Sequence, residues 1–339
     1  MGAGARRIGG MPRLRSLAIL GWVLLAPVYG QSPETSPETL VVTLPAPAVS
    51  ETASETEPAW QPAPETSTIG AKRGLMWKAF SARNTVYLLG SIHMASRDLY
   101  PLPDHIEQAF RKSNVLVVEV DLNRLDHTKF ESLMAANGLY PRQDSLWNHV
   151  SPGTRQLVVD FCQKHSMDPD SFARMKPWLA AFATSFLPVA AMPQNLAPGI
   201  DKYFLDEAGD RMRVEPLESA EYQVRLLSTL PEVQQEHNLL SAVKNAGQSA
   251  QDFQKLQTLW VDGDPDKLNT YLASSMRDDP EYEKRVFADR NPRMADRAEQ
   301  CLKSADRCFI VVGAGHMVGK DGVVHLLQNR GYKVEQVVQ

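Results

Sequence analysis

The stretch TVYLLGSIH at residues 85–93 and the stretch CFIVVGAGH at residues 308–316 share one pattern, an apolar strand that runs into Gly-x-x-His. The histidines of the two stretches, His93 and His316, each follow directly on the expected end of a buried strand. Open α/β sheets bind ligands outside the carboxyl ends of their strands, and glycine there lets the backbone turn sharply and approach a ligand closely. The pattern therefore predicts that two histidines from opposite ends of the chain converge on one site.

Each Gly-x-x-His motif is followed by a helix and a second strand. The first unit reads strand 85–90, helix 104–112 and strand 115–120, and the second reads strand 309–312, helix 322–329 and strand 332–338. Right-handed crossovers would place all these strands in one sheet. We predict an α/β fold with a central mixed sheet built from two such halves, as in an internal duplication. With only two copies, chance repetition is the alternative.

The middle of the chain reads as mostly helical. Residues from about 151 to 275 carry apolar side chains at spacings of three and four, punctuated by Pro and Gly, with one strand expected near 213–217. We predict a large helical insertion between the two halves of the sheet. It would form a cap or a wall of a cleft, or simply a helical layer over the sheet.

The amino-terminal residues do not read as part of the fold. Four arginines precede the apolar run 17–26, and a signal peptidase would cut near Gly30, so 1–30 is predicted to be a signal peptide. Residues 31–69, rich in Pro, Ser, Thr and Glu, read as a disordered tether, and 70–339 as the folded domain. The expected location is periplasmic or secreted. Membrane contact would arise only from an uncleaved signal segment, although the apolar run is shorter than the roughly 20 residues of a membrane span.

Charge and cysteine content narrow the class of protein. The formal charge is −4, and the chain lacks the basic stripe that phosphate binding requires, so no nucleic-acid partner is expected. Three cysteines are too few for a disulfide scaffold. Cys301 and Cys308 would pair in an oxidising compartment or remain buried thiols, and Cys162 reads as a core residue. The sequence does not predict an oligomeric state.

An acidic residue interrupts the valines at the end of the strand near 115–120. Burial of an unpaired carboxylate is unfavourable and raises its pKa, so something must compensate Glu119. A divalent metal bound by His93, Glu119 and His316 would do so, since two imidazoles and a carboxylate suit Zn, Mn, Co or Fe. The alternative is that Glu119 pairs with an arginine or accepts backbone hydrogen bonds.

Better known catalytic motifs do not occur. The chain has no H-E-x-x-H motif, and Ser91 does not lie in a G-x-S-x-G turn. Ser91 and His93 would form a nucleophile and base only if they shared a hydrogen bond, which residues two positions apart at a strand end do not guarantee. The glycines at 313–322 fail the dinucleotide spacing G-x-G-x-x-G.

These motifs together resemble the TraB/GumN family, whose eukaryotic relatives include the Tiki proteases. The resemblance runs from about residue 75 to 338 and rests on LLGSIH at 88–93, VVEVD at 117–121 and, above all, VGAGHMVG at 312–319. It implies that the two Gly-x-x-His motifs and the strand-end glutamate form the active centre. Because Tiki proteases are metal-dependent peptidases that favour Mn or Co, it also implies such a metal here.

The sequence is thus most consistent with a metal-dependent hydrolase, a metallopeptidase-like enzyme that acts on a peptide or protein substrate. Its bound ion would activate water, with Asp121 or Glu218 as orienting group or general base and Arg290 beside the developing oxyanion. Two alternatives remain. One is a metal-free hydrolase that uses histidine as base, as in the similar erythromycin-esterase-like fold. The other is a protein that binds and sequesters a peptide without cleaving it, since TraB itself is linked to shutting down a peptide pheromone.

Overall fold

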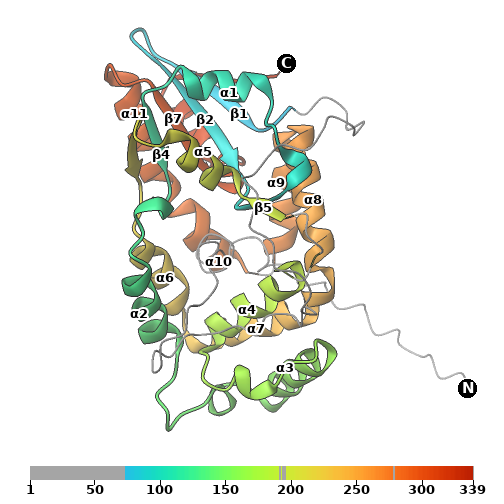
Figure 1. Cartoon of the computed structure of the whole chain (residues 1–339). Helices are drawn as coiled ribbons and strands as arrows, with labels where there is room; N and C mark the ends of the chain where they lie inside the picture. The colour runs from blue at the N-terminus through green and yellow to red at the C-terminus, as the bar shows by residue number, and fades with distance from the viewer. Residues whose placement is uncertain (1–72, 191, 193–195, 278, 339) are drawn as a thin grey trace, which may run out of the picture.

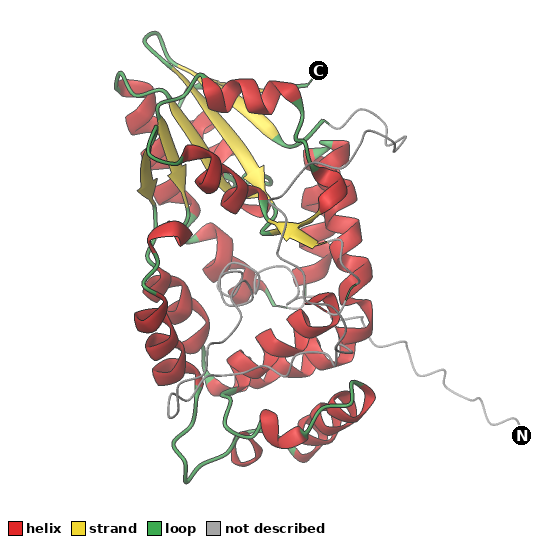
Figure 2. Ribbon diagram, viewed as in Figure 1, coloured by secondary structure: helices red, strands yellow, loops and turns green. Residues whose placement is uncertain are grey.

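The computed structural model describes residues 73–190, 192, 196–277 and 279–338. The expected signal peptide and tether, 1–30 and 31–69, lie outside the described residues. Figures 1 and 2 show a strand-rich part and a helical part stacked one on the other.

A mixed six-stranded sheet forms the strand-rich part, which confirms the predicted α/β fold. Its strand order is β6-β4-β7-β2-β1-β8. The first four of these strands run parallel, whereas β1 is antiparallel to both β2 and β8. The strands are β1 (Met76–Phe80), β2 (Thr85–Ser91), β4 (Val115–Val118), β6 (Arg213–Pro216), β7 (Cys308–Gly313) and β8 (Lys333–Gln336).

The two Gly-x-x-His units interleave in this sheet. Strand β7 of the second unit lies between β2 and β4 of the first, with Ser91 opposite Gly313 and Val118 opposite Val311. Every residue of β4 and β7 is buried, as expected of central parallel strands covered on both faces. The carboxyl ends of β2, β7 and β4 therefore meet at one edge of the sheet.

Four helices pack around the sheet. Helices α1 and α5 pack against β7 through the rings of Phe110, Phe204 and Phe309, and α11 contacts β2 and β7. The helices are α1 (Asp104–Arg111), α5 (Ile200–Ala208), α11 (Asn291–Lys303) and α12 (Val323–Asn329).

Most of the remaining helices build a second hydrophobic core beneath the sheet (Figure 1). Its centre is α4, nearly all of whose residues are buried. Helices α8 (Ser249–Asp262) and α9 (Pro265–Met276) instead contribute side chains such as Trp260 and Leu272 to the core of the sheet. The chain does not stay helical across the middle, because β6 returns to the sheet and β5 (Leu196–Pro198) pairs with β3 (Met94–Ser96) in a small sheet that the sequence did not predict. The helices are α2 (His127–Gly138), α3 (Pro152–Lys164), α4 (Pro177–Ala190), α6 (Ala220–Ser228), α7 (Glu232–Asn245), α8 (Ser249–Asp262), α9 (Pro265–Met276) and α10 (Pro280–Glu283). Within the described residues, no helix is both long and apolar enough to cross a bilayer.

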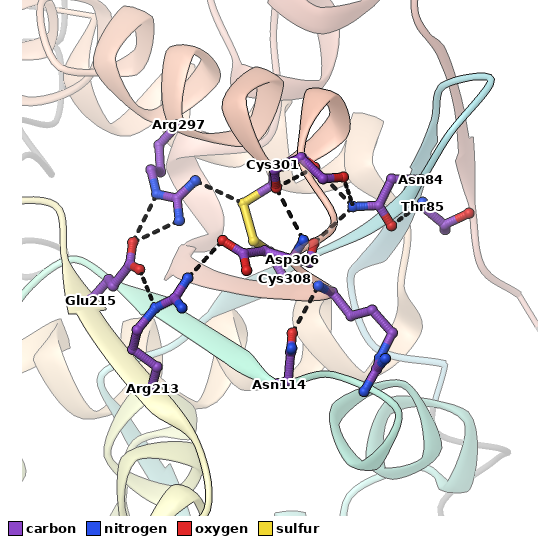
Figure 3. Close-up of a disulfide and its surroundings, with 11 residues drawn as sticks. Asn84, Thr85, Asn114, Arg213, Glu215, Arg297, Cys301, Asp306 and Cys308 are labelled. Carbon is purple, nitrogen blue, oxygen red and sulfur yellow. Dashed lines mark hydrogen bonds and ion pairs between the residues drawn. A yellow bond between two sulfur atoms is a disulfide. The ribbon is translucent and has the colours of Figure 1, made fainter.

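A disulfide joins the end of α11 to the start of β7 (Figure 3). Of the two alternatives for Cys301 and Cys308, the structure has the pair, whereas Cys162 is a buried free thiol as predicted. Arg297 donates a hydrogen bond to the sulfur of Cys301 and pairs with Glu215 on β6 (Figure 3). The link thus fixes α11 to the sheet at the end opposite the Gly-x-x-His motifs.

Candidate active site

The residues that the sequence singled out come together where four strands end. His93 lies just beyond β2, His316 closes the short helix η8 (Ala314–His316) after β7, Glu119 follows β4, and Glu218 follows β6. The backbone N–H of Glu218 donates to the carbonyl of Glu119, which extends the β4–β6 pairing past the strands. Residues more than two hundred positions apart in the chain thus share one crevice.

Gly313 forms the floor of this cluster. Its N–H donates to Glu119 Oε1 at 2.6 Å. A Cβ atom placed on Gly313 would lie 3.2 Å from Glu119 Oε1, 3.3 Å from His93 Nε2 and 3.6 Å from His316 Cδ2. The three side chains therefore surround the same small space, and the absence of a side chain at residue 313 keeps it open.

Each histidine is held by an oxygen atom on its Nδ1 side. His93 Nδ1 lies 3.1 Å from Asp201 Oδ1 in the first turn of α5, and His316 Nδ1 lies 2.6 Å from Asn291 Oδ1 in the first turn of α11. Because a carboxylate and an amide oxygen only accept, both Nδ1 atoms carry hydrogen. In the neutral imidazoles both Nε2 lone pairs then remain free.

Close backbone contact places the start of α5 against His93. A Cβ atom at Gly199 would lie 2.3 Å from the carbonyl of His93, so only glycine fits there. The N–H of Ile200 donates to the carbonyl of Ile92, and Asp201 follows directly. Asp201 was not among the predicted site residues, although Gly199-Ile200-Asp201 is one of the segments that resemble the TraB/GumN family.

Arg290 neutralises Glu119 and Glu218 together. Its Nη2 lies 2.6 Å from Glu119 Oε2 and 2.7 Å from Glu218 Oε2, and its Nε donates to Glu218 Oε1. Nη1 donates to the carbonyl of Val286. The structure thus contains the alternative compensation for Glu119, both an arginine and a backbone donor. Arg290 thus supports the two glutamates and also lines the cavity, and its predicted place beside a developing oxyanion stays a prediction.

The positions of Arg290 and Asn291 follow from an irregular helix. A π-helix, η7 (Lys284–Ala288), precedes them, a local form that often occurs at functional sites. Arg290 is the residue before α11, and Asn291 is the first residue of that helix, where its side chain contacts His316.

Burial and charge move the pKa values of the two histidines apart. Burial disfavours charge on His316 and, with the nearby Arg290 guanidinium, lowers its pKa to about 3. Burial acts the same way on His93, but the carboxylates of Asp201 and Glu119 outweigh it and raise its pKa. Burial opposes the charge of Glu119 as well, yet Arg290 and the histidines hold its pKa far below the usual range. At neutral pH the site thus contains a carboxylate, a neutral imidazole and a second imidazole that readily accepts a proton.

A cavity of about 90 Å³ opens beside these groups. Phe287 packs edge-on against His316, with ring centroids 5.0 Å apart, and closes one side. Much of the wall is apolar, with helices α6, α8 and α9 supplying side chains: Leu226, Leu227, Phe253, Leu256, Trp260, Leu268 and Leu272. The cavity therefore has the polar side chains of His93, Glu119 and His316 on one side and an apolar surface on the other.

Two residues of the prediction stand apart from the polar cluster. Asp121 uses its carboxylate to accept from the N–H groups of Asn123 and Arg124, and it does not line the cavity. Ser91 lines the cavity, but its hydroxyl has no hydrogen-bond partner within the described residues, so no Ser91–His93 pair forms.

The donor types of the cluster fit a divalent cation. Metal-binding histidines usually donate their second nitrogen to an oxygen atom, as His93 and His316 do here, and Glu119 Oε1 lies 3.7 Å from His316 Nε2. As the side chains stand, no three His, Cys, Asp or Glu residues of the described ranges are arranged to coordinate an ion. Binding would require Glu119 to be shared between the ion and Arg290.

The part of the chain that matches known proteins includes the segments that form the candidate site. The TraB/PrgY/gumN family model matches residues 75–336. The chain is similar to "Uncharacterized protein YbaP" of Escherichia coli K12, at 25% identity over 71% of this chain and 87% of YbaP. It is also similar to an "Uncharacterized protein" of Treponema pallidum, at 22% identity over 78% of this chain and 83% of that protein. No solved structure matches. Since the family match spans the whole sheet and both Gly-x-x-His motifs, this chain belongs to the TraB/PrgY/gumN family.

Proposed function

We propose that this protein is a metal-dependent hydrolase that cleaves peptide bonds in a peptide or protein substrate. The observation that carries the proposal is the pair of imidazoles fixed through Nδ1, whose Nε2 atoms face the same space beside Glu119. His93, His316 and Glu119 would hold the ion, with Mn²⁺ or Co²⁺ as first candidates and Zn²⁺ or Fe²⁺ as others. When bound, such an ion lowers the pKa of water and polarises a carbonyl group.

The remaining residues of the cluster support this chemistry by position and charge. Asp201 and Asn291 fix the tautomers of the two histidines, and Arg290 keeps Glu119 ionised in a buried setting. Glu218 lies beside Glu119 on the same guanidinium and supports it. The apolar cavity wall excludes water and fits a substrate with an apolar side chain near the scissile bond.

A second candidate is hydrolysis without metal, favoured by the Arg290–Glu119 ion pair, which already compensates the buried carboxylate. His93, oriented by Asp201, would then take the proton of an attacking water at Nε2 and later pass it to the leaving amine. A protein that binds a peptide without cleaving it would use the same cavity.

The Cys301–Cys308 disulfide supports a periplasmic or secreted location, because disulfides persist in oxidising compartments. Cell fractionation followed by alkylation of free thiols tests this. Recovery of the protein in the cytosol with all its cysteines reduced would contradict it.

Elemental analysis tests the metal assignment. The mature protein, purified without chelating resin, is expected to contain nearly one equivalent of a divalent metal, and His93→Ala is expected to lose it. His325→Ala on the exposed side of α12 is the matched control and should keep it. A mixed fluorogenic peptide library then tests cleavage. Metal-free protein that still cleaves would favour the second candidate, and binding without cleavage would favour sequestration.

A further inference from the structure

Gln223 on α6 is a buried amide at the rim of the acidic cluster. It is 5% exposed and lines the cavity. Its Nε2 donates to Glu119 Oε2 at 3.2 Å and to Glu218 Oε2 at 3.1 Å. Both hydrogens of the amide nitrogen are therefore used by carboxylates.

These two bonds fix the orientation of the amide. In the opposite orientation the amide oxygen would face two ionised carboxylates, which only accept hydrogen bonds. Gln223 Oε1 must therefore act as the free acceptor of this side chain. It is buried and has no hydrogen-bond partner within the described residues.

An unpartnered buried acceptor is unfavourable, because the group has lost its hydrogen bonds to water and gained none in return. The partner that Gln223 Oε1 lacks must be a hydrogen-bond donor. One turn further along α6, Leu226 and Leu227 line the same cavity, so Gln223 is a polar residue on an otherwise apolar part of the wall. A group that suits the position carries an N–H among apolar atoms, as the backbone of a peptide does.

We propose that Gln223 is a specificity-determining residue that accepts a hydrogen bond from one backbone N–H of the substrate. The inference rests on the proposed peptide hydrolysis and refines it, because it makes the site select an amide over an ester at one position. A carbonyl of the substrate cannot take that place, since the nitrogen of Gln223 is already occupied.

The test replaces single N–H groups of the substrate by oxygen. The best cleaved peptide from the mixed fluorogenic library is resynthesised as a series of esters, each with one backbone N–H away from the scissile bond replaced. One replacement is expected to lower kcat/KM roughly tenfold to a hundredfold in the wild-type protein. In Gln223→Met the same replacement should have no further effect, because the acceptor is gone.

A second buried glutamine provides the matched control. Gln235 is also 5% exposed, but its Nε2 donates to backbone carbonyls at the end of α6 and just beyond, away from the cavity. Gln235→Met should respond to the ester series as the wild type does. If Gln223→Met does not fold, the ester series on the wild-type protein remains informative, because the contacts of Gln223 with Glu119 and Glu218 are intact in that protein.

The outcomes separate the two proposals. Cleavage of all esters at equal rates by the wild type, or the same ester sensitivity in Gln223→Met, overturns the role of Gln223 and leaves peptide hydrolysis standing. A wild-type protein that neither cleaves nor binds any peptide of the library overturns both. Peptide hydrolysis and the role of Gln223 are both supported if one ester replacement slows cleavage by the wild type and by Gln235→Met but not by Gln223→Met.

Discussion

Gly313→Ala adds one methyl group to the centre of the candidate active site. The backbone of Gly313 has φ −48° and ψ 136°, values that alanine adopts freely, so the chain itself is not strained. The new carbon would lie 3.2 Å from Glu119 Oε1 and 3.3 Å from His93 Nε2, and these atoms must withdraw by a few tenths of an ångström.

The expected result is a loss of function with little loss of stability. The methyl fills the space that the two histidines and the glutamate share, so an ion or a substrate atom can no longer occupy it. Displacements near 1 Å already reduce rates about a hundredfold, and exclusion of the reacting group adds to this, so kcat/KM should fall at least about a hundredfold. The free energy of unfolding should change by only about 1 kcal/mol.

Peptide cleavage and metal content measure the loss of function, and guanidinium denaturation measures the free energy of unfolding. Gly153→Ala on α3 is the matched control, because its new carbon would have no neighbour closer than 4.0 Å. A Gly313→Ala protein that keeps both full metal content and full activity would refute the placement of the reaction between these side chains.

Three further predictions concern the supports of the site. Arg290→Met should lower the free energy of unfolding by about 3–5 kcal/mol in guanidinium denaturation, because it leaves two carboxylates without their charge partner, and a loss under about 1 kcal/mol would contradict this. In protein freed of metal by a chelator, His316 should lower the free energy of unfolding as the pH falls from 6.5 toward 3, because its imidazole becomes protonated in the unfolded chain but stays neutral in the folded protein. Its share is about 2 kcal/mol at pH 5, and His316→Gln should flatten that part of a stability–pH curve. Replacing Cys301 and Cys308 together by serine should lower the free energy of unfolding by about 2–3 kcal/mol, measured by thermal denaturation, with peptide cleavage unchanged at 25 °C.

The sequence predicted the parts of the fold that depend on local pattern. The apolar strands before His93 and His316 occur as β2 and β7, because short apolar runs that contain β-branched and aromatic residues and end in glycine favour buried strands. The helix expected near 104–112 and the strand near 213–217 are present as α1 and β6. The small sheet of β3 and β5 was not predicted, since three-residue strands carry too little periodicity to recognise.

The sequence could not identify the partners of the catalytic candidates. Asp201 and Asn291 lie at the starts of two helices, a common place for polar residues, and nothing local indicates which histidine each would contact. Arg290, which lies between η7 and α11, contacts Glu119 although the two residues are 171 positions apart in the chain. Such pairs depend on long-range packing, which a single sequence does not display.

The position of β7 between β2 and β4 also has a consequence for biosynthesis. During translation β2 and β4 emerge first, and the strand that separates them emerges only after the whole helical middle of the chain, since β4 ends at Val118 and β7 begins at Cys308. Until then both apolar strands keep unpaired edges, which expose the nascent chain to aggregation. The same delay keeps His93 and His316 apart, so the candidate site is assembled only after β7 has been synthesised and has paired with β2 and β4.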